Sequence, residues 1–220
     1  MSSSKLSLIE AAAGPEWDEL VARSPQGTLF SESAYLNAAG CRFHLYRVMQ
    51  NQDLKAGVAV VVSEDGQRCV LDDLVIYDGI LFVLDPERPL TKRRQDEFQI
   101  TEFVIDQLTQ RYPHIEVQLS PLFGDMRPFL WYGYHEAGTP KFGIDLRYTS
   151  YVDISSLQPA SGDDEQTSCF LNLEKVRRYS VREGRKKGGS VVRVNTADTL
   201  VAFYHALMAR QGETVADDKL

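Results

Sequence analysis

The chain has 220 residues, 43% of them hydrophobic, enough to bury a sizeable core as one large domain or as a domain and part of another. Its net charge of −7 argues against a general nucleic-acid-binding protein. Three widely separated cysteines without a signal-peptide pattern predict reduced thiols and a cytoplasmic location. No apolar run approaches the roughly 20 residues that span a bilayer, so we expect no integral membrane contact.

The first forty residues predict two short helices. Pro15 suits the first turn of a helix, and Ser24, which precedes a proline, suits its end. For the second helix, either Ser31 or Ser33 can cap the N-terminus, and Gly40 suits the C-terminus.

A change to two-residue periodicity then predicts antiparallel strands joined by hairpins. Four β-branched runs are separated by turn sequences: RFHLYRVMQ, KAGVAVVVSEDG, QRCVLDDLVIYDG and GILFVLDP. Segment 90–112 places apolar side chains near helical spacing, so we expect a helix that ends at Pro113. The compact run HIEVQLSP and the alternating run KFGIDLRYTSYVDIS predict two further extended segments.

A polar segment follows this predicted sheet. Residues 155–169 are rich in Ser, Gly, Pro and acidic residues and predict a linker. After it we expect a helix of about sixteen residues from Phe170, the strand SVVRVN, and a helix that Asp198 caps.

These elements predict an α/β (α+β) fold in two parts. Residues 1–154 form a mixed, mostly antiparallel sheet covered by helices, and residues 170–220 begin a second unit. Because the second unit stops before it could close a sheet of its own, we expect a truncated chain or an incomplete gene product.

Three stretches form a recognisable pattern. The early run WDELVARSPQGTLF, residues 125–155 and the run RRYSVREGRKKGGSVVRVNTADTLVAFYHALMARQG resemble the FemAB/FemX-like acyltransferases. The basic helix followed by glycine, a Val-rich strand and an Asp-started helix is the most specific part. The resemblance implies tandem GNAT-like (N-acetyltransferase-like) halves, of which this chain holds the first and the entrance to the second.

The resemblance also implies transfer of an acyl or aminoacyl group to an amine. The donor would be an acyl-CoA or an aminoacyl-tRNA, the acceptor a nucleotide-linked, amino-sugar or peptide amine, and no cofactor would be bound permanently. Two departures separate the chain from known patterns. The stretch FSESAYLNAAG lacks the lysine that helps some relatives bind acceptor phosphates, and the R/Q-x-x-G-x-G/A pyrophosphate loop of acetyl-CoA enzymes is missing.

The run LEKVRRYSVREGRKKGG holds seven of the 24 basic residues. On a helix, Lys175, Arg178, Arg182 and Arg185 form one stripe, and a row of planar guanidinium groups suits phosphate oxygens. The window Glu174–Arg193 contributes +6, so the rest of the chain sums to −13.

The resemblance implies that this stripe helps to hold the phosphates of a nucleotide-linked acceptor or of a tRNA. Arg178 and Arg182 are the first candidates, followed by Arg185 and Lys187. The alternative interpretation of this stripe is a basic helix face that contacts only solvent. Two other functions also stay open: a non-catalytic GNAT-like module that binds a phosphorylated carbohydrate or an acidic partner, and a tRNA-binding fragment, which the negative charge elsewhere disfavours.

The run FLWYGYHE concentrates aromatic residues. Trp131, Tyr132 and Tyr134 could stack on a sugar or base, and His135 could act as a general base, although the alternative is a strand whose aromatic side chains pack the core. The carboxylates of DDLVIYDG, Asp72, Asp73 and Asp78, are further candidate bases, with Asp73 put forward first and turn residues as the alternative. The histidines show no metal-ligand spacing, so the sequence predicts no metal site.

Overall fold

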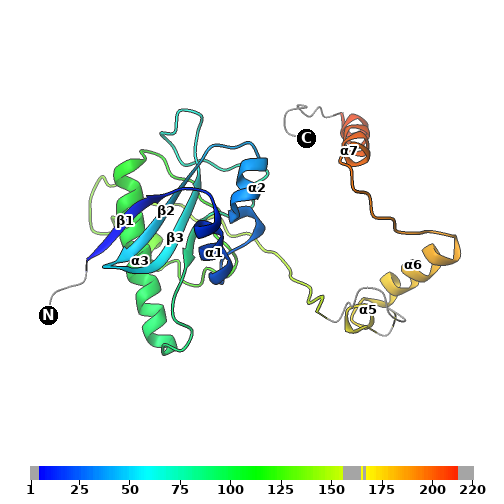
Figure 1. Ribbon diagram of the computed structural model, residues 1–220, viewed down its shortest axis with the longest axis horizontal. Coiled ribbons are helices and arrows are strands. Elements are labelled where there is room, and N and C mark those ends of the chain that lie inside the picture. Colours follow the sequence, from blue (N-terminus) through cyan, green and yellow to red (C-terminus); the bar gives the residue numbers. More distant parts are fainter. Residues whose placement is uncertain (1–4, 156–164, 166, 213–220) are drawn as a thin grey trace. The chain divides into compact units, whose positions relative to one another are not determined.

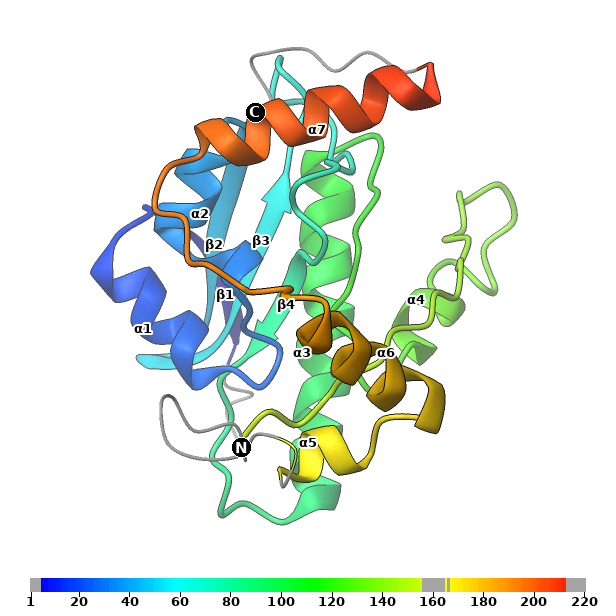
Figure 2. The same ribbon diagram turned by 90° about the vertical axis from the view of Figure 1, so that its right-hand side faces the viewer.

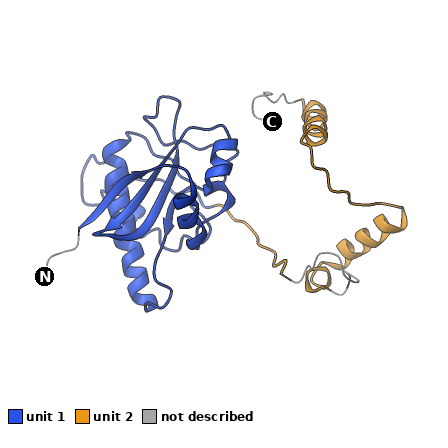
Figure 3. Cartoon of the chain, viewed as in Figure 1, with its two compact units in different colours: residues 1–146 blue, residues 147–220 orange. Residues whose placement is uncertain are grey.

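The computed structural model describes residues 5–155, 165 and 167–212. Most of the predicted linker, 155–169, therefore lies outside the described residues. The chain divides into two compact units, residues 1–146 and 147–220 (Figure 3).

Unit 1 is built on a four-stranded antiparallel sheet in the order β1-β2-β3-β4 (Figure 1). The strands are β1 (Leu6–Ala11), β2 (Phe43–Gln50), β3 (Asp53–Val61) and β4 (Gly79–Phe82). The β2–β3 hairpin turns at Asn51, whose φ of 58° is a left-handed conformation that asparagine adopts more readily than most residues. Together with its helices the sheet gives a mixed α+β fold, which confirms the predicted fold class at this level.

Helices pack on both faces of the sheet (Figure 2). α1 (Pro15–Arg23) and α2 (Ser33–Ala38) cover one face, and α3 (Leu90–Arg111) covers the other. Trp17 on α1 is fully buried, and its indole N–H donates to the Ser31 carbonyl at 2.7 Å. This bond fixes the loop between α1 and α2 against the sheet.

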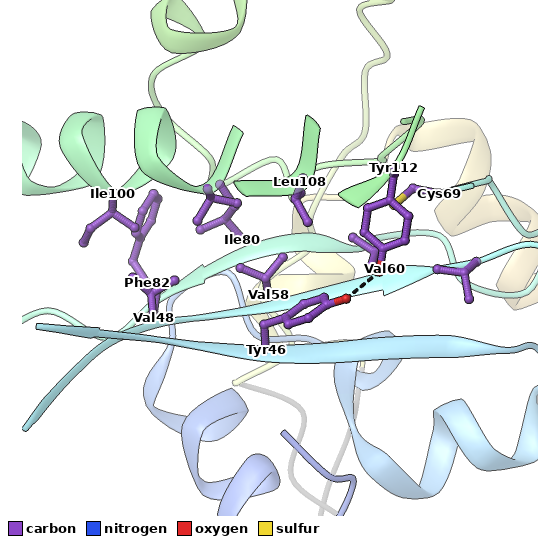
Figure 4. Packing of buried hydrophobic residues seen from close by; sticks show 13 residues of the cluster. Tyr46, Val48, Val58, Val60, Cys69, Ile80, Phe82, Ile100, Leu108 and Tyr112 are labelled. Atoms are coloured by element: carbon purple, nitrogen blue, oxygen red, sulfur yellow. Dashed lines mark hydrogen bonds between the residues drawn. The ribbon is translucent and has the colours of Figure 1, made fainter. Parts of the chain in front are cut away.

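On the opposite face, apolar side chains of α3 point toward those of the strands (Figure 4). The buried set comprises Tyr46, Val48, Ala56, Val58, Val60, Val62, Cys69, Ile80, Phe82, Ile100, Val104, Leu108 and Tyr112. Burying each large aliphatic or aromatic side chain contributes about 1.5–3 kcal/mol. The Tyr112 hydroxyl bonds to the Tyr46 hydroxyl at 2.5 Å and to His44 Nδ1 at 2.6 Å, so these polar groups are paired.

Several predicted elements of unit 1 are confirmed: the two early helices, the strands around residues 43–50, 53–61 and 79–82, and the helix before Pro113. The strand β1 was not predicted from the sequence. The predicted caps Ser31 and Ser33 are wrong, because Glu32 is the N-cap residue of α2.

The predicted strand QRCVLDDLVIYDG is also wrong. Outside β4 this stretch is a loop with only isolated bridges, such as Val62 with Cys69. Asp72 Oδ1 accepts the Leu74 N–H at 2.8 Å, an Asx turn that bends the chain. HIEVQLSP makes isolated parallel bridges, residues 141–155 form no strand, and FLWYGYHE begins in the short helix α4 (Arg127–Trp131).

The regular elements of unit 2 within the described residues are the helices α5 (Ser168–Leu171), α6 (Lys175–Lys186) and α7 (Asp198–Gln211), and segments without regular structure join α6 to α7. The single helix predicted from Phe170 is therefore interrupted, and the predicted strand SVVRVN is not formed. Asp198 is the first residue of α7, and Ala197 is its N-cap. No residue of α6 or α7 is buried. None of the helices within the described ranges combines the length and apolar character needed to cross a lipid bilayer.

Candidate functional site

A second backbone segment runs parallel to β4 on the edge away from β3. Its contact begins just before the strand, where the Asp78 N–H donates to the Gln118 carbonyl at 2.8 Å and Asp78 forms a parallel bridge with Leu119. The Gln118 N–H in turn donates to Asp78 Oδ1 at 2.6 Å. The first rung of this ladder, meaning the first pair of residues bonded across the two segments, therefore has two hydrogen bonds, one between backbone groups and one to the Asp78 side chain.

The next rung is missing. In a parallel ladder the Ile80 N–H would donate to the Ser120 carbonyl, but that carbonyl accepts the Phe123 N–H at 2.8 Å instead. The Val83 N–H donates to the Lys55 carbonyl on β3. Successive backbone N–H groups of a strand point alternately toward and away from the neighbouring strand, so the Ile80 N–H, three residues before Val83, points away from β3. Among the described residues, no hydrogen bond reaches it, although Ile80 is only 3% exposed.

The third rung is made through a side chain. Gln26 Oε1 accepts the Phe82 N–H at 3.1 Å, and Gln26 Nε2 donates to the Leu122 carbonyl at 3.1 Å. The amide of Gln26 therefore stands between two backbone groups that would otherwise face each other. We call the interruption at Ile80 and Ser120, bounded by Asp78 at one end and Gln26 at the other, the ladder gap.

Local sequence places Gln26 at this position. The C-cap residue of α1 is Ser24, whose Oγ accepts the Gln26 N–H and donates to Gln26 Oε1, both at 3.2 Å. A Cβ on Gly27 would lie 2.0 Å from the Val21 carbonyl oxygen, so only glycine lets the loop turn back against α1 here. Gln26 is 5% exposed, its amide oxygen accepts two hydrogen bonds, and its NH₂ group donates one.

An apolar crevice adjoins the ladder gap on the α3 side. It is lined by Val58, Gly79, Ile80, Val104, Ile105, Leu108, Ile115, Val117, Leu119, Phe129 and Phe142. Gly79 has a φ of 90°, and a Cβ there would lie 2.6 Å from Leu119 Cδ2, so glycine permits both the bend and the close approach. The lining carries no charged side chain, and the free space of about 10 Å³ is no larger than one water molecule needs.

Asp78 is a buried carboxyl group at the end of the ladder gap. Burial raises its pKa to about 7, although hydrogen bonds from backbone N–H groups oppose this shift. The neighbouring thiol of Cys69 is also buried, and burial, with a smaller contribution from Asp78, raises its pKa to about 12. Asp78 thus titrates near neutral pH.

Of the predicted general bases, Asp78 lies at the ladder gap, whereas Asp73 and His135 lie elsewhere. Asp73 is exposed in the turn that follows Asp72, and His135 is exposed after α4, where its ring contacts the edge of Tyr134 at 5.0 Å between centroids. Neither residue lines the apolar crevice.

The predicted aromatic platform is not assembled as one surface. Trp131 packs against Phe98 at 5.8 Å, with the Arg127 guanidinium 5.6 Å from the indole. Tyr132 packs against Phe142 instead, and Tyr134 lies under the Lys141 ammonium group. Each of the three predicted stacking residues therefore has a different set of neighbours.

In unit 2, three of the predicted arginines lie on one face of α6 and reach back toward α5. Both Nε and Nη2 of Arg182 bond to Glu165 Oε2, at 2.8 and 2.7 Å, and Arg185 Nη1 lies 3.4 Å from Glu165 Oε1. Arg178 Nη1 donates to the Leu171 carbonyl at 2.8 Å. We call Arg178, Arg182 and Arg185 the arginine face.

A carboxylate therefore already lies against the arginine face. The Arg182 guanidinium also packs 5.4 Å from the ring centre of Phe170, which orients its fork of donors. Lys187, the fourth predicted phosphate ligand, is the C-cap residue of α6 and is exposed.

Comparisons with known proteins found no matching family model, curated protein or solved structure. The described residues contain no group of three or more His, Cys, Asp or Glu residues that could hold a metal ion. The sequence identified neither Gln26 nor Ile80 as a site residue, whereas Asp78 was one of the three carboxylates predicted as candidate bases. The only sequence signals were the SPQG and YDG turns that contain or adjoin them.

Proposed function

We propose that unit 1 is an acyltransferase domain of the FemAB-like type, and that the acyl carbonyl group of the donor binds at the ladder gap. The observation that carries the proposal is the N–H of Ile80, which has no hydrogen-bond partner in the described part of the chain. A buried N–H without a partner costs about 1–3 kcal/mol, so native proteins rarely keep one without a use for it. A ligand carbonyl oxygen would satisfy it.

The same donor suits the chemistry of acyl transfer. A neutral amine attacks the acyl carbon, a C–N bond forms, and the C–O bond of an ester or the C–S bond of a thioester breaks. The amine's proton passes to the leaving oxygen or sulfur, directly or through water. A fixed backbone N–H in a site shielded from water stabilises the negative charge on the carbonyl oxygen, and no covalent enzyme intermediate is needed.

The order of elements supports the GNAT-like part of the proposal. One strand, two short helices, three antiparallel strands and a long helix precede the segment that runs parallel to β4.

The arginine face favours a phosphate-containing acceptor or donor. Its pairing with the Glu165 carboxylate supports an oxyanion-binding role, since Arg forks bind carboxylate and phosphate with similar geometry. Because such a face can bind a phosphate without any catalysis, it also favours a second candidate function, a non-catalytic module that binds a phosphorylated carbohydrate.

One experiment separates the two functions. The full chain is incubated with acyl-CoAs and charged tRNAs as donors, and with nucleotide-linked amino sugars and peptide amines as acceptors, and products are detected by mass spectrometry. We expect an N-acylated product from at least one pair. Absence of product together with thermal stabilisation by a nucleotide sugar would support the binding module instead.

A further inference from the structure

At the third position of the ladder, the primary amide of Gln26 replaces a direct bond between two backbone groups. Continuing the register of the Asp78–Gln118 bond by four residues would pair the Phe82 N–H with the Leu122 carbonyl. Gln26 instead offers its carbonyl to Phe82 and its NH₂ group to Leu122. The two backbone groups are complementary to each other, and the amide is complementary to both.

We propose that Gln26 is a positioning residue that holds β4 and residues 118–122 apart and so keeps the Ile80 N–H unpaired. This inference rests on the proposed function for its catalytic meaning, but its structural content can be tested alone. Without the amide, the Phe82 N–H and the Leu122 carbonyl can bond directly. That rung would bring the neighbouring Ser120 carbonyl back toward Ile80 and close the ladder gap.

A glutamine suits this role because the position needs an acceptor and a donor on one rigid group. Glutamate would place a carboxylate oxygen against the Leu122 carbonyl, and methionine, of similar length, would satisfy neither backbone group. Ser24 Oγ donates to the amide oxygen of Gln26 and accepts the backbone N–H of the same residue, so both ends of this buried side chain are held in place.

A purely structural role for Gln26 makes the opposite prediction. If the amide only fastened residues 118–122 to the sheet, its loss would loosen both segments, and the amide hydrogens of Ile80 and Phe82 would exchange faster. If it holds them apart, its loss closes the ladder gap, and the Ile80 amide becomes hydrogen-bonded.

Amide hydrogen exchange, followed residue by residue by NMR on the full chain, decides between these roles. In Gln26→Met we expect exchange at Ile80 to slow by about tenfold, the effect of one added hydrogen bond. Gln52→Met, which changes an exposed glutamine in the β2–β3 turn, is the matched control and should leave Ile80 unchanged. Unchanged or faster exchange at Ile80 in Gln26→Met overturns the proposal.

A second variant covers the case in which Gln26→Met does not fold. Gln26→Asn keeps the amide on a side chain one methylene shorter, so it should draw the two segments together and slow exchange at Ile80 by about threefold, part of one hydrogen bond. Faster or unchanged exchange in this variant counts against the proposal equally.

Activity then tests the link to function. With a donor and acceptor that the wild-type chain turns over, Gln26→Met should lower kcat/KM by at least about tenfold, and Gln26→Asn should recover part of the loss. Slower exchange at Ile80 without any wild-type turnover would uphold the positioning role and refute the acyltransferase function. Full activity in a variant whose ladder gap has closed would refute the catalytic link.

Discussion

Gln26 and Phe82 lie 56 positions apart in the sequence, and the side-chain carbonyl of the first accepts the backbone N–H of the second at 3.1 Å. This bond joins the loop after α1 to the last strand of the sheet. Because the same amide also reaches Leu122, one side chain connects three segments at the edge where the sheet stops being continuous. The candidate site is therefore a property of the tertiary fold.

The bend at Gly79 should be essential to this edge. Gly79→Ala introduces both backbone strain, from the φ of 90°, and a clash with Leu119. Gly138 has the same φ but open space around its Cβ position, so Gly138→Ala carries the strain alone. We expect Gly79→Ala to lower the free energy of unfolding by about 1–3 kcal/mol more than Gly138→Ala does. Urea unfolding measures both, and equal losses would contradict the close approach.

Asp78 should make stability depend on pH. Its folded pKa of about 7 lies above its ordinary value of 3.8, so the fold favours the neutral acid. The stabilisation is complete below about pH 4 and is lost as the pH rises through 7. Asp78→Asn removes this titration, whereas Asp73→Asn, at an exposed position, is the control.

Urea unfolding at pH 5 and pH 8 tests this dependence. Relative to Asp78→Asn, the wild-type chain should lose on the order of 1–3 kcal/mol between these pH values. A wild-type chain and Asp78→Asn variant that differ by the same free energy at both pH values would show that Asp78 does not titrate in this range.

The arginine face should bind phosphate without supporting the fold. Arg178→Ala with Arg182→Ala should weaken binding of a nucleotide sugar by about tenfold or more, since each charge-assisted bond contributes about 1.5–3 kcal/mol. Helicity should persist, because no residue of α6 is buried. Lys186→Ala, which removes a charge paired with Glu183, is the control. Titration calorimetry and circular dichroism give the two readouts, and unchanged affinity would remove phosphate binding from this face.

Glu165 should compete with an anionic ligand for the same arginines. Glu165→Gln removes the charge that faces Arg182 and Arg185, and we expect the affinity for a nucleotide sugar to rise by about two- to fivefold, as suits an exposed ion pair. The gain should shrink at high salt. A lower affinity in the variant would mean that Glu165 orients the arginines instead of competing for them.

Local patterns predicted much of the sheet and its helices. The alternation of β2, the valine-rich run of β3 and the apolar spacing of α3 are strong signals, because each of these elements buries at least one face. β1 escaped prediction because it is a short edge strand whose alternation is weak. The loop from 67 to 78 contains a β-branched run, but the turn at Asp72 overrides its strand preference.

The candidate site was predictable only in part. Helical spacing predicted the arginine face, since side chains at i, i+4 and i+7 share one side of a helix. The ladder gap has no such pattern: the state of the Ile80 N–H depends on where the Ser120 carbonyl turns and on a glutamine far away in the sequence. Residue types do not record which backbone group lacks a partner.

The most direct test of the proposed function is the amide signal of Ile80 in ¹H–¹⁵N spectra of the full chain while the acyl donors of the turnover panel are added. Binding of an acyl carbonyl at the ladder gap predicts a downfield shift of the Ile80 amide proton with any donor that is turned over, while Phe82, already bonded to Gln26, moves little. Formation of an N-acylated product while the Ile80 signal stays in place would contradict the account.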